Sequence, residues 1–571
     1  MHDLLIKNGT VVDGTGVQPQ CADIAVTDGS VVEVGRDLGS AHRVIDADGL
    51  LVTPGWIDIH THYDAQATWD EQLAPSIWHG VTSVIMGNCG VGFAPASPDK
   101  RSWLIDIMEA VEEIPAAALN EGMQWGWESF PEYLDVLRAK PRTLNVGALL
   151  GHVPLRAYVM GERAFDSATD TDIQAMARLA ADAVTGGALG FSTSRTLMHV
   201  DSTGRPIPGS FATEKELVAI GSAIGATGRG VIEWVPKSLT GDDWPGLDDD
   251  MRIMKEIALR SGRPVSFLMP ECAADPEKWR EQLSFCLDAA SEGARIQPQV
   301  YGRPVGQLFS LQGFHPFFHL PSFAPLKEMP LAQKWQAMQN PELKQRLLAE
   351  TDPNEVGMSM VFKNEDLLWP LVYRMGTPPS YAPPPEESIA SIAKREDRSP
   401  REVAIDCLLE NDGRNFLLFV GGGYAYKNLN AIHEMVSHPH TLLGGSDGGA
   451  HVTVVCDYSM PTSTLLNFFG DSPEGSPNHL PIEFIVKKLT KDGADHFGIE
   501  GRGTLEPGMA ADINLIDMDA LAVEQPEFVH DLPAGEARLM QKSTGYVSTF
   551  VAGQAIQENG QATGLLPGSV F

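Results

Sequence analysis

The chain has 571 residues, of which 43% are hydrophobic and 20% charged, an ordinary composition for a globular protein large enough for more than one domain. Its 75 acidic and 42 basic residues give a formal net charge of −33, which argues against nucleic acid and anionic membranes as partners, because both bind basic surfaces. No apolar run is long enough to cross a membrane, and the six cysteines are scattered, so we expect a reduced cytoplasmic protein.

Both ends of the chain have a β-rich pattern. The first 50 residues alternate short apolar runs with the turn dipeptides Asn8-Gly9, Asp28-Gly29 and Asp48-Gly49. The same alternation of short apolar runs with turn residues is found near the C-terminus, as in GTLEPGMAADINLIDMD. We therefore predict a small split β-sandwich built from residues 1–55 and 505–571, with residues 56–504 inserted as a second domain.

The middle of the chain alternates apolar strand candidates with helical segments. Amphipathic stretches such as DTDIQAMARLAADAVTGG have apolar residues at helical spacing. The strand candidates cover residues 52–60, 81–89, 144–152, 188–194, 230–235, 263–269, 294–301 and 441–447. Eight strands that alternate with helices predict an α/β fold, a (β/α)₈ TIM-like barrel, whose active site lies at the carboxyl ends of the strands.

An aromatic and proline-rich stretch interrupts this alternation at about residues 300–440. A long excursion of this kind on a barrel is either a lid-like insertion or an ordinary packed one. Its phenylalanines suggest a bulky acyl or aryl group in the substrate, or they fill the small core of the insertion itself: Phe309, Phe314, Phe317, Phe318 and Phe323.

Four residues at strand ends have side chains that bind zinc. His60 and His62 are two residues apart, so a strand points both imidazoles to one face. Cys89 and Asp447 end two other predicted strands and add a thiolate and a carboxylate. Taken singly, each residue has a plainer interpretation, a hydrogen-bonded histidine or a small buried cysteine. Together they predict a metal site in which the carboxylate of Asp447 can also move a proton.

The ordered motifs HTHYD, GNCGVGFAP, GALGFSTS and GGSDGGAH resemble the amidohydrolase superfamily and, within it, the N-acyl-D-amino-acid deacylase (D-aminoacylase)-like branch. The resemblance implies that His60, His62, Cys89 and Asp447 are metal ligands, with Cys89 in place of a carboxylated lysine. It implies that Asp447 is the catalytic proton shuttle. The reaction implied is hydrolysis of the amide C–N bond of an N-acyl compound by a metal-activated water.

The chain departs from this branch at strands five and six, where the branch has metal-binding histidines. Here those segments read GVIEWVPKS and RPVSFLMPE, and neither contains a histidine. Glu233 or Glu271 could supply an oxygen ligand, and Lys237 is nearby, but no spacing selects among them. We therefore expect one Zn²⁺ per chain, with another divalent metal as the alternative.

Six residues are candidates for substrate binding. Tyr301 and Arg303 either are hydrogen-bond donors that stabilise a developing oxyanion, or are a packed tyrosine and a surface arginine near the insertion. Arg156 and Arg195 follow strands three and four and could bind a substrate carboxylate. The twenty-two residues after Asp447 contain one basic-type side chain, His451, so a generic amide is favoured over an N-acyl amino acid. His152 is expected either to bind substrate or metal, or to hydrogen-bond a metal ligand.

The sequence thus predicts a metal-dependent amidohydrolase that acts on a small-molecule N-acyl amide, either an N-acyl amino acid or a bulkier aryl or acyl amide. Two alternatives stay open at this point. One is hydrolysis of a cyclic amide, lactone or carbamate at the same site, and the other is a degenerate barrel that binds a ligand without catalysis. The sequence leaves the assembly open between a monomer and a homo-oligomer.

Overall fold

A computed structural model describes residues 1–239, 241–353 and 363–571. Its central sheet has eight parallel strands in the order β16-β12-β11-β10-β9-β8-β7-β6. They are β6 (Trp56–Asp58), β7 (Val81–Met86), β8 (Asn145–Gly151), β9 (Gly190–Ser194), β10 (Val231–Val235), β11 (Val265–Leu268), β12 (Ile296–Val300) and β16 (Leu442–Leu443). A parallel bridge between Thr61 and Gly448 joins the segments after the first and last strands, so the sheet closes on itself. The predicted eight-stranded barrel is confirmed.

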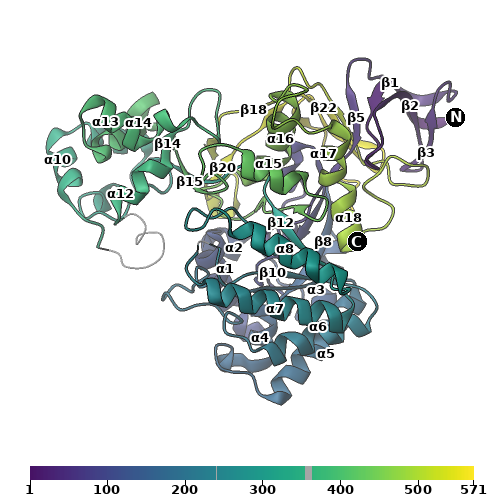
Figure 1. The fold of residues 1–571 in the computed structure, drawn as a ribbon, viewed down its shortest axis with the longest axis horizontal. Coiled ribbons are helices and arrows are strands. Elements are labelled where there is room, and N and C mark those ends of the chain that lie inside the picture. Colours follow the sequence, from purple (N-terminus) through teal and green to yellow (C-terminus); the bar gives the residue numbers. More distant parts are fainter. Residues whose placement is uncertain (240, 354–362) are drawn as a thin grey trace.

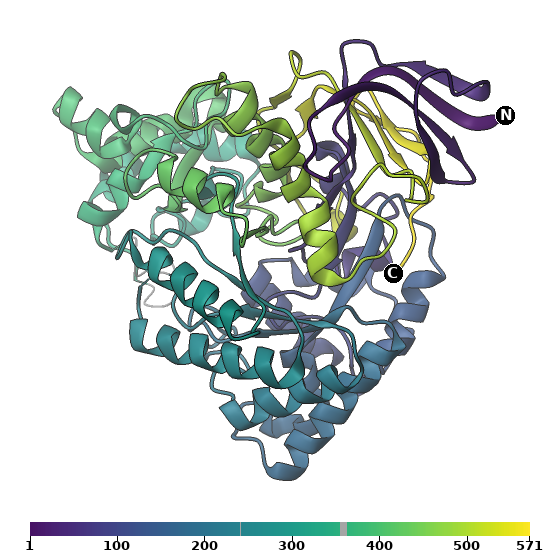
Figure 2. The same ribbon diagram turned by 45° about the vertical axis from the view of Figure 1, so that its right-hand side comes forward.

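Helices cover the outside of this sheet (Figures 1 and 2). The segment between β7 and β8 contains α1 (Arg101–Glu112), α2 (Ala116–Gly122) and α3 (Phe130–Arg138). After β8, β9, β10 and β11 come α4 (His152–Met160) with α5 (Asp170–Gly186), α6 (Glu214–Ala226), α7 (Trp244–Ser261) and α8 (Lys278–Ser291). In α5 the side chains of Thr169 and Asp172 form a capping box, and Ile173, Met176 and Ala180 bury one face against the barrel.

Strands from both ends of the chain share one nine-stranded sheet, in the order β24-β23-β22-β17-β5-β1-β2-β3, with β4 paired to β1. Its members are β1 (His2–Val11), β2 (Gln20–Thr27), β3 (Ser30–Gly35), β4 (Ala41–Asp46), β5 (Leu51–Pro54), β17 (Ile513–Ile516), β22 (Tyr546–Val551), β23 (Gln554–Glu558) and β24 (Gln561–Ala562). Ile6, Ile24, Ile513 and Phe550 lie in its common apolar core, each fully buried. A β domain made from both ends is therefore present, and the exact boundaries at 55 and 505 stay a prediction.

The insertion between β12 and β16 has a core of its own and forms the lobe at the left of Figure 1. Its three-stranded sheet has β15 (Leu417–Gly422) between β13 (Val305–Phe309) and β14 (Val372–Arg374). Around it lie α9 (Leu331–Met338), α10 (Pro341–Ala349), α12 (Glu365–Leu368), α13 (Ile389–Glu396) and α14 (Pro400–Gly413), and α15 (Asn430–Ser437) leads back to the barrel. Phe309, Phe317 and Phe323 are buried in this core, and Phe314 and Phe318 pack against it. These rings therefore fill the insertion and do not form a free aromatic wall.

Three α-helices in the described part of the chain follow β16, namely α16 (Met460–Leu465), α17 (Ile482–Leu489) and α18 (Lys491–Phe497). None of the described helices combines the length and the apolar composition that a bilayer span requires.

Candidate metal centre

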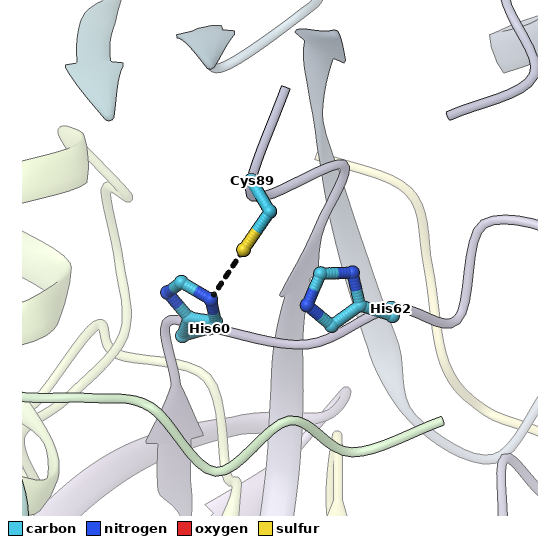
Figure 3. A group of neighbouring side chains, drawn as sticks. All are labelled: His60, His62 and Cys89. Carbon is cyan, nitrogen blue, oxygen red and sulfur yellow. Dashed lines mark hydrogen bonds between the residues drawn. The ribbon is translucent and has the colours of Figure 1, made fainter. Parts of the chain in front are cut away.

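Two strand ends bring His60, His62 and Cys89 together (Figure 3). His60 and His62 follow β6, Cys89 follows β7, and one ligand atom from each residue lies within 4.8 Å of the others. The Sγ atom of Cys89 is 3.4 Å from Nε2 of His60. All three side chains are buried, so the barrel mouth holds two imidazoles and a thiol in one water-poor cluster.

Asp447 comes to the same cluster from the segment after β16. Its Oδ1 atom lies 3.4 Å from Nε2 of His60 and 3.6 Å from Nε2 of His62. The Asp447 N–H donates to the carbonyl of His60 at 3.1 Å, and the His62 N–H donates to the carbonyl of Gly448 at 2.7 Å. These backbone hydrogen bonds fix the carboxylate beside both imidazoles, while a quarter of its side chain stays open to solvent.

Two residues of the cluster have left-handed backbone conformations, with φ of 57° at Cys89 and 49° at Asp447. Residues other than glycine rarely adopt this region, and each instance has an energetic cost that the surrounding fold must offset. Such conformations concentrate at functional sites because they aim a side chain that an extended backbone would direct elsewhere.

The buried groups fit a divalent cation. Neither ring nitrogen of His62 has a hydrogen-bond partner, although the ring is buried. Burial lowers the pKa of His60 to about 4 and so keeps that imidazole in its neutral, ligating form. Burial, with Glu112 and Glu233 nearby, raises the pKa of the Cys89 thiol, and a bound cation would reverse this effect by stabilising the thiolate. Two imidazoles, a thiolate and a carboxylate are a donor set that zinc accepts.

Carboxylates that the sequence did not point to lie on the far side of His62. Oε1 of Glu112, at the end of α1, is 3.6 Å from Nδ1 of His62. Its other oxygen is 3.7 Å from Nε2 of His451, and Glu113 accepts from Nδ1 of His451 at 2.9 Å. Burial opposes a charge on His62, but Glu112 and Asp447 outweigh it and raise the pKa of His62 to about 9. No local motif marks the end of α1, so tertiary packing alone places these groups.

Gln299 of β12 orients the other imidazole, with its Oε1 atom 3.1 Å from Nδ1 of His60. Sequence reasoning missed Gln299, although a buried amide in an apolar strand is a usable signal. It also missed His199, in the loop after β9, whose Nδ1 atom is 2.9 Å from the Ser194 hydroxyl. Burial and the neighbouring imidazoles of His451 and His62 lower the pKa of His199 to about 3, so its ring is neutral.

The fifth and sixth barrel strands, β10 and β11, differ in what their residues contribute to the metal cluster. Glu233 of β10 accepts the N–H of Cys89 at 3.1 Å, and its second oxygen lies 4.0 Å from Nδ1 of His60. Burial raises the pKa of Glu233 to about 8. Glu271 instead accepts the N–H of Ala425 at 2.9 Å, and Lys237 lies 3.8 Å from Asp249. Of the three residues considered for these strands, Glu233 is therefore the one that contacts the cluster.

The structure gives His152 and Arg156 a common buried partner. Nε2 of His152 lies 2.9 Å from Oε1 of Glu216 in α6, and Nδ1 lies 2.8 Å from the Thr193 hydroxyl. Arg156 forms an ion pair with the same Glu216 oxygen. All three charged or polar side chains are at most 3% exposed. Their contacts hold α4 to α6, and they leave the guanidinium of Arg156 already paired.

The other predicted substrate residues differ in their contacts. Arg195 pairs with Asp250 at 3.2 Å, and Arg303 pairs with Asp457 at 2.9 Å. Tyr301 packs so closely against Gly445 that a Cβ atom on residue 445 would lie 2.2 Å from the tyrosine ring. Burial and Asp447 raise the pKa of Tyr301 well above its usual value, so the phenol keeps its proton. Tyr301 thus lies beside the Asp447 segment, whereas the two arginines are bound to buried carboxylates.

A sequence model of the amidohydrolase family matches residues 43–557. An uncharacterized protein of Mycobacterium tuberculosis is 28% identical over 99% of this chain and 93% of its own length. D-aminoacylase of Alcaligenes xylosoxydans xylosoxydans is 36% identical over 228 residues, which cover 40% of this chain and 43% of that enzyme. A crystal structure of D-aminoacylase shares the fold with a TM-score of 0.65 at 23% identity, covering 100% of this chain and 99% of that one. N-acyl-D-glutamate deacylase of Bordetella bronchiseptica, complexed with zinc and a phosphonate inhibitor, has the same TM-score at 21% identity, with the same coverage.

Proposed function

The chain belongs to the amidohydrolase family, and from that premise we propose that it hydrolyses the amide C–N bond of an N-acyl compound at the His60, His62, Cys89 and Asp447 cluster. Membership makes the chain a hydrolase of carbon–nitrogen bonds other than peptide bonds. The observation that carries the proposal is the meeting of these four side chains at one end of the barrel. The local similarity to D-aminoacylase supports a linear N-acyl amide as the substrate class.

The four residues would hold one divalent cation, for which we propose Zn²⁺ because imidazole, thiolate and carboxylate are its usual ligands. A cation there would polarise the amide carbonyl and make a nearby water more acidic. Gln299 and Glu112 would orient the two imidazoles through their Nδ1 atoms. Glu233, which accepts the Cys89 N–H, would hold the loop that bears the thiol. It would not serve as a metal ligand in place of the histidines that are absent from strands five and six.

Asp447 is our proposed proton shuttle. Burial opposes ionisation of its carboxyl, but His62 and His60 outweigh burial and lower its pKa below the usual value. Its carboxylate, a quarter exposed, can take a proton from the attacking water and return it to the departing amine nitrogen. We assign to the protonated phenol of Tyr301, whose ring packs on Gly445 two residues before Asp447, the hydrogen bond to the carbonyl oxygen as negative charge develops there.

A panel of N-acetyl amides of primary amines and of both amino-acid enantiomers, incubated with zinc-loaded protein, tests the proposal by release of free amine. Asp447→Asn is expected to lower kcat by about 10²–10⁴. Asp471→Asn makes the same charge change at an exposed position and should leave kcat unchanged. Cleavage of cyclic amides with none of the linear ones, or full activity of Asp447→Asn, would overturn the proposal.

A further inference from the structure

We infer that the preferred substrate is an N-acyl amine with no carboxylate beside the scissile bond. In such a substrate, an uncharged, apolar substituent of the amine lies toward His451 and the loop after β9. This inference rests on the proposed amide hydrolysis and specifies its substrate class. Three independent observations support it: the partners of His451, the pairing of the basic residues that follow the strands, and the exposed apolar residues of one loop.

His451 is the residue nearest to Asp447 in sequence that could bind an anion, but both of its ring nitrogens face carboxylates. Nδ1 is 2.9 Å from Oε2 of Glu113, and Nε2 is 3.7 Å from Oε2 of Glu112. About a quarter of the His451 and Asp447 side chains and half of Glu113 are exposed, so these groups form the solvent side of the cluster. A substrate carboxylate arriving here would compete with Glu113 for His451 and meet like charge from Glu112 and Asp447.

The basic side chains that follow the barrel strands are paired in the same way. Arg156 after β8 contacts Glu216, Arg195 after β9 contacts Asp250, and Arg303 after β12 contacts Asp457. Lys237 after β10 lies 3.8 Å from Asp249. The three arginine pairs are almost completely buried, and removing a guanidinium from such a pair would leave a carboxylate without its counter-charge.

The loop after β9 provides apolar surface on the same side of the barrel. Leu197 is 41% exposed and Met198 is 49% exposed, directly before His199, whose Nδ1 atom lies 2.9 Å from the hydroxyl of Ser194 at the carboxyl end of β9. Large apolar side chains that remain exposed at the carboxyl ends of the barrel strands, the end that also bears the metal-binding residues, favour an apolar ligand, because binding removes their surface from water. An uncharged hydrocarbon substituent fits the apolar surface of this loop better than a carboxylate does.

N-acetylphenethylamine and N-acetylphenylalanine differ by the carboxylate alone, so they form a matched pair of substrates. With zinc-loaded protein we expect kcat/KM for N-acetylphenethylamine to exceed that for either enantiomer of N-acetylphenylalanine by about 10-fold or more. Equal or greater kcat/KM for an N-acetylphenylalanine enantiomer would overturn this inference and leave amide hydrolysis standing. Failure to cleave any linear N-acyl amide would overturn the proposed function, and this inference with it.

Glu113→Gln gives a second test, because it frees Nδ1 of His451 from its carboxylate partner. We expect the preference for N-acetylphenethylamine to fall by about 5-fold in this variant, through a lower KM for N-acetylphenylalanine. Asp106→Asn makes the same charge change at an exposed position of α1 and should leave the preference as in the wild type. The same ratio in Glu113→Gln and wild type would show that His451 does not set the preference.

Discussion

The Sγ atom of Cys89 lies 3.4 Å from Nε2 of His60, although the two residues end different strands and are 29 positions apart. The contact depends on the left-handed backbone at Cys89, with φ of 57°, and on Glu233, which accepts the Cys89 N–H. Three neighbouring parts of the barrel therefore cooperate to bring one thiol to one imidazole. A buried cysteine that served only as a small apolar residue would need neither the unusual backbone nor the carboxylate partner.

Replacing Cys89 by serine tests whether the thiol is a ligand. Serine keeps the size of the side chain but provides a hydroxyl, which binds zinc far more weakly than a thiolate does. We expect Cys89→Ser to lose at least about 10-fold in zinc affinity and, when loaded with Co²⁺, to lack the sulfur-to-metal charge-transfer band of the wild type. Cys21→Ser, at an exposed cysteine, should retain both properties. The same cobalt spectrum in Cys89→Ser and wild type would rule out Cys89 as a ligand.

Glu112→Gln tests the orientation of His62. The carboxylate of Glu112 lies 3.6 Å from Nδ1 of His62 and would hold the ring with Nε2 facing the metal. Loss of its charge should weaken zinc binding by about 10–100-fold with no change in the circular dichroism spectrum. Titration calorimetry measures the affinity, with Asp106→Asn as the control on the same helix. Wild-type affinity in Glu112→Gln would mean that the carboxylate does not orient the imidazole.

Arg156→Ala separates a structural from a substrate-binding role. Arg156 shares the buried Glu216 with His152, so its removal leaves a buried carboxylate short of its partner. We expect the free energy of unfolding to fall by about 3–5 kcal/mol while KM stays near the wild-type value. Arg138→Ala removes an exposed pair with Asp135 and should cost less than about 1 kcal/mol. A raised KM with undiminished stability would instead place Arg156 at the substrate.

Lys488 gives the protein a predictable dependence of stability on pH. Its ammonium group is buried in α17 and donates to the carbonyls of His438 and Thr441, at the entry to β16. Burial lowers the pKa of Lys488 from 10.5 to about 8, so between these values the unfolded chain binds more protons and stability rises with pH. The free energy of unfolding of wild type, relative to that of Lys488→Met, should therefore rise by about 3 kcal/mol across this pH range.

Unfolding by denaturant at several pH values between about 8 and 10.5 measures this difference. Lys215→Met serves as the control, because Lys215 forms an exposed pair with Asp170. A difference between wild type and Lys488→Met that does not change with pH would contradict the assignment of a destabilised charge to Lys488.

The main features of the site could be predicted because they depend on strand order. His60, His62, Cys89 and Asp447 each follow a buried strand, and the carboxyl ends of parallel strands in a barrel meet at one mouth. The alternation of apolar strands and turn residues in the sequence is therefore enough to predict that these four side chains lie together. The same logic predicted the eight strands, and hairpin signals at both ends predicted the shared β sheet.

Partners across the fold could not be predicted in this way. Arg156, Arg195 and Arg303 do follow strands, as expected, but their partners lie in other elements: Glu216 in α6, Asp250 in α7 and Asp457 in a short 3-10 helix after β16. Glu112 and Glu113 lie at a helix end and His199 lies in a loop, so neither period two nor helical spacing marks them. Local pattern determines the face on which a side chain lies, whereas its partner depends on how separate elements pack.

The proposal of one catalytic zinc ion is tested most directly by the hydrolysis rate of N-acetylphenethylamine, measured as zinc is added in steps to metal-free protein. We predict that the rate rises from near zero and reaches its plateau at about one zinc per chain. In the variant His60→Asn the rate should stay near zero at the same zinc concentrations. A plateau at about two zinc ions per chain, or a rate that does not depend on zinc, would contradict a single catalytic zinc ion.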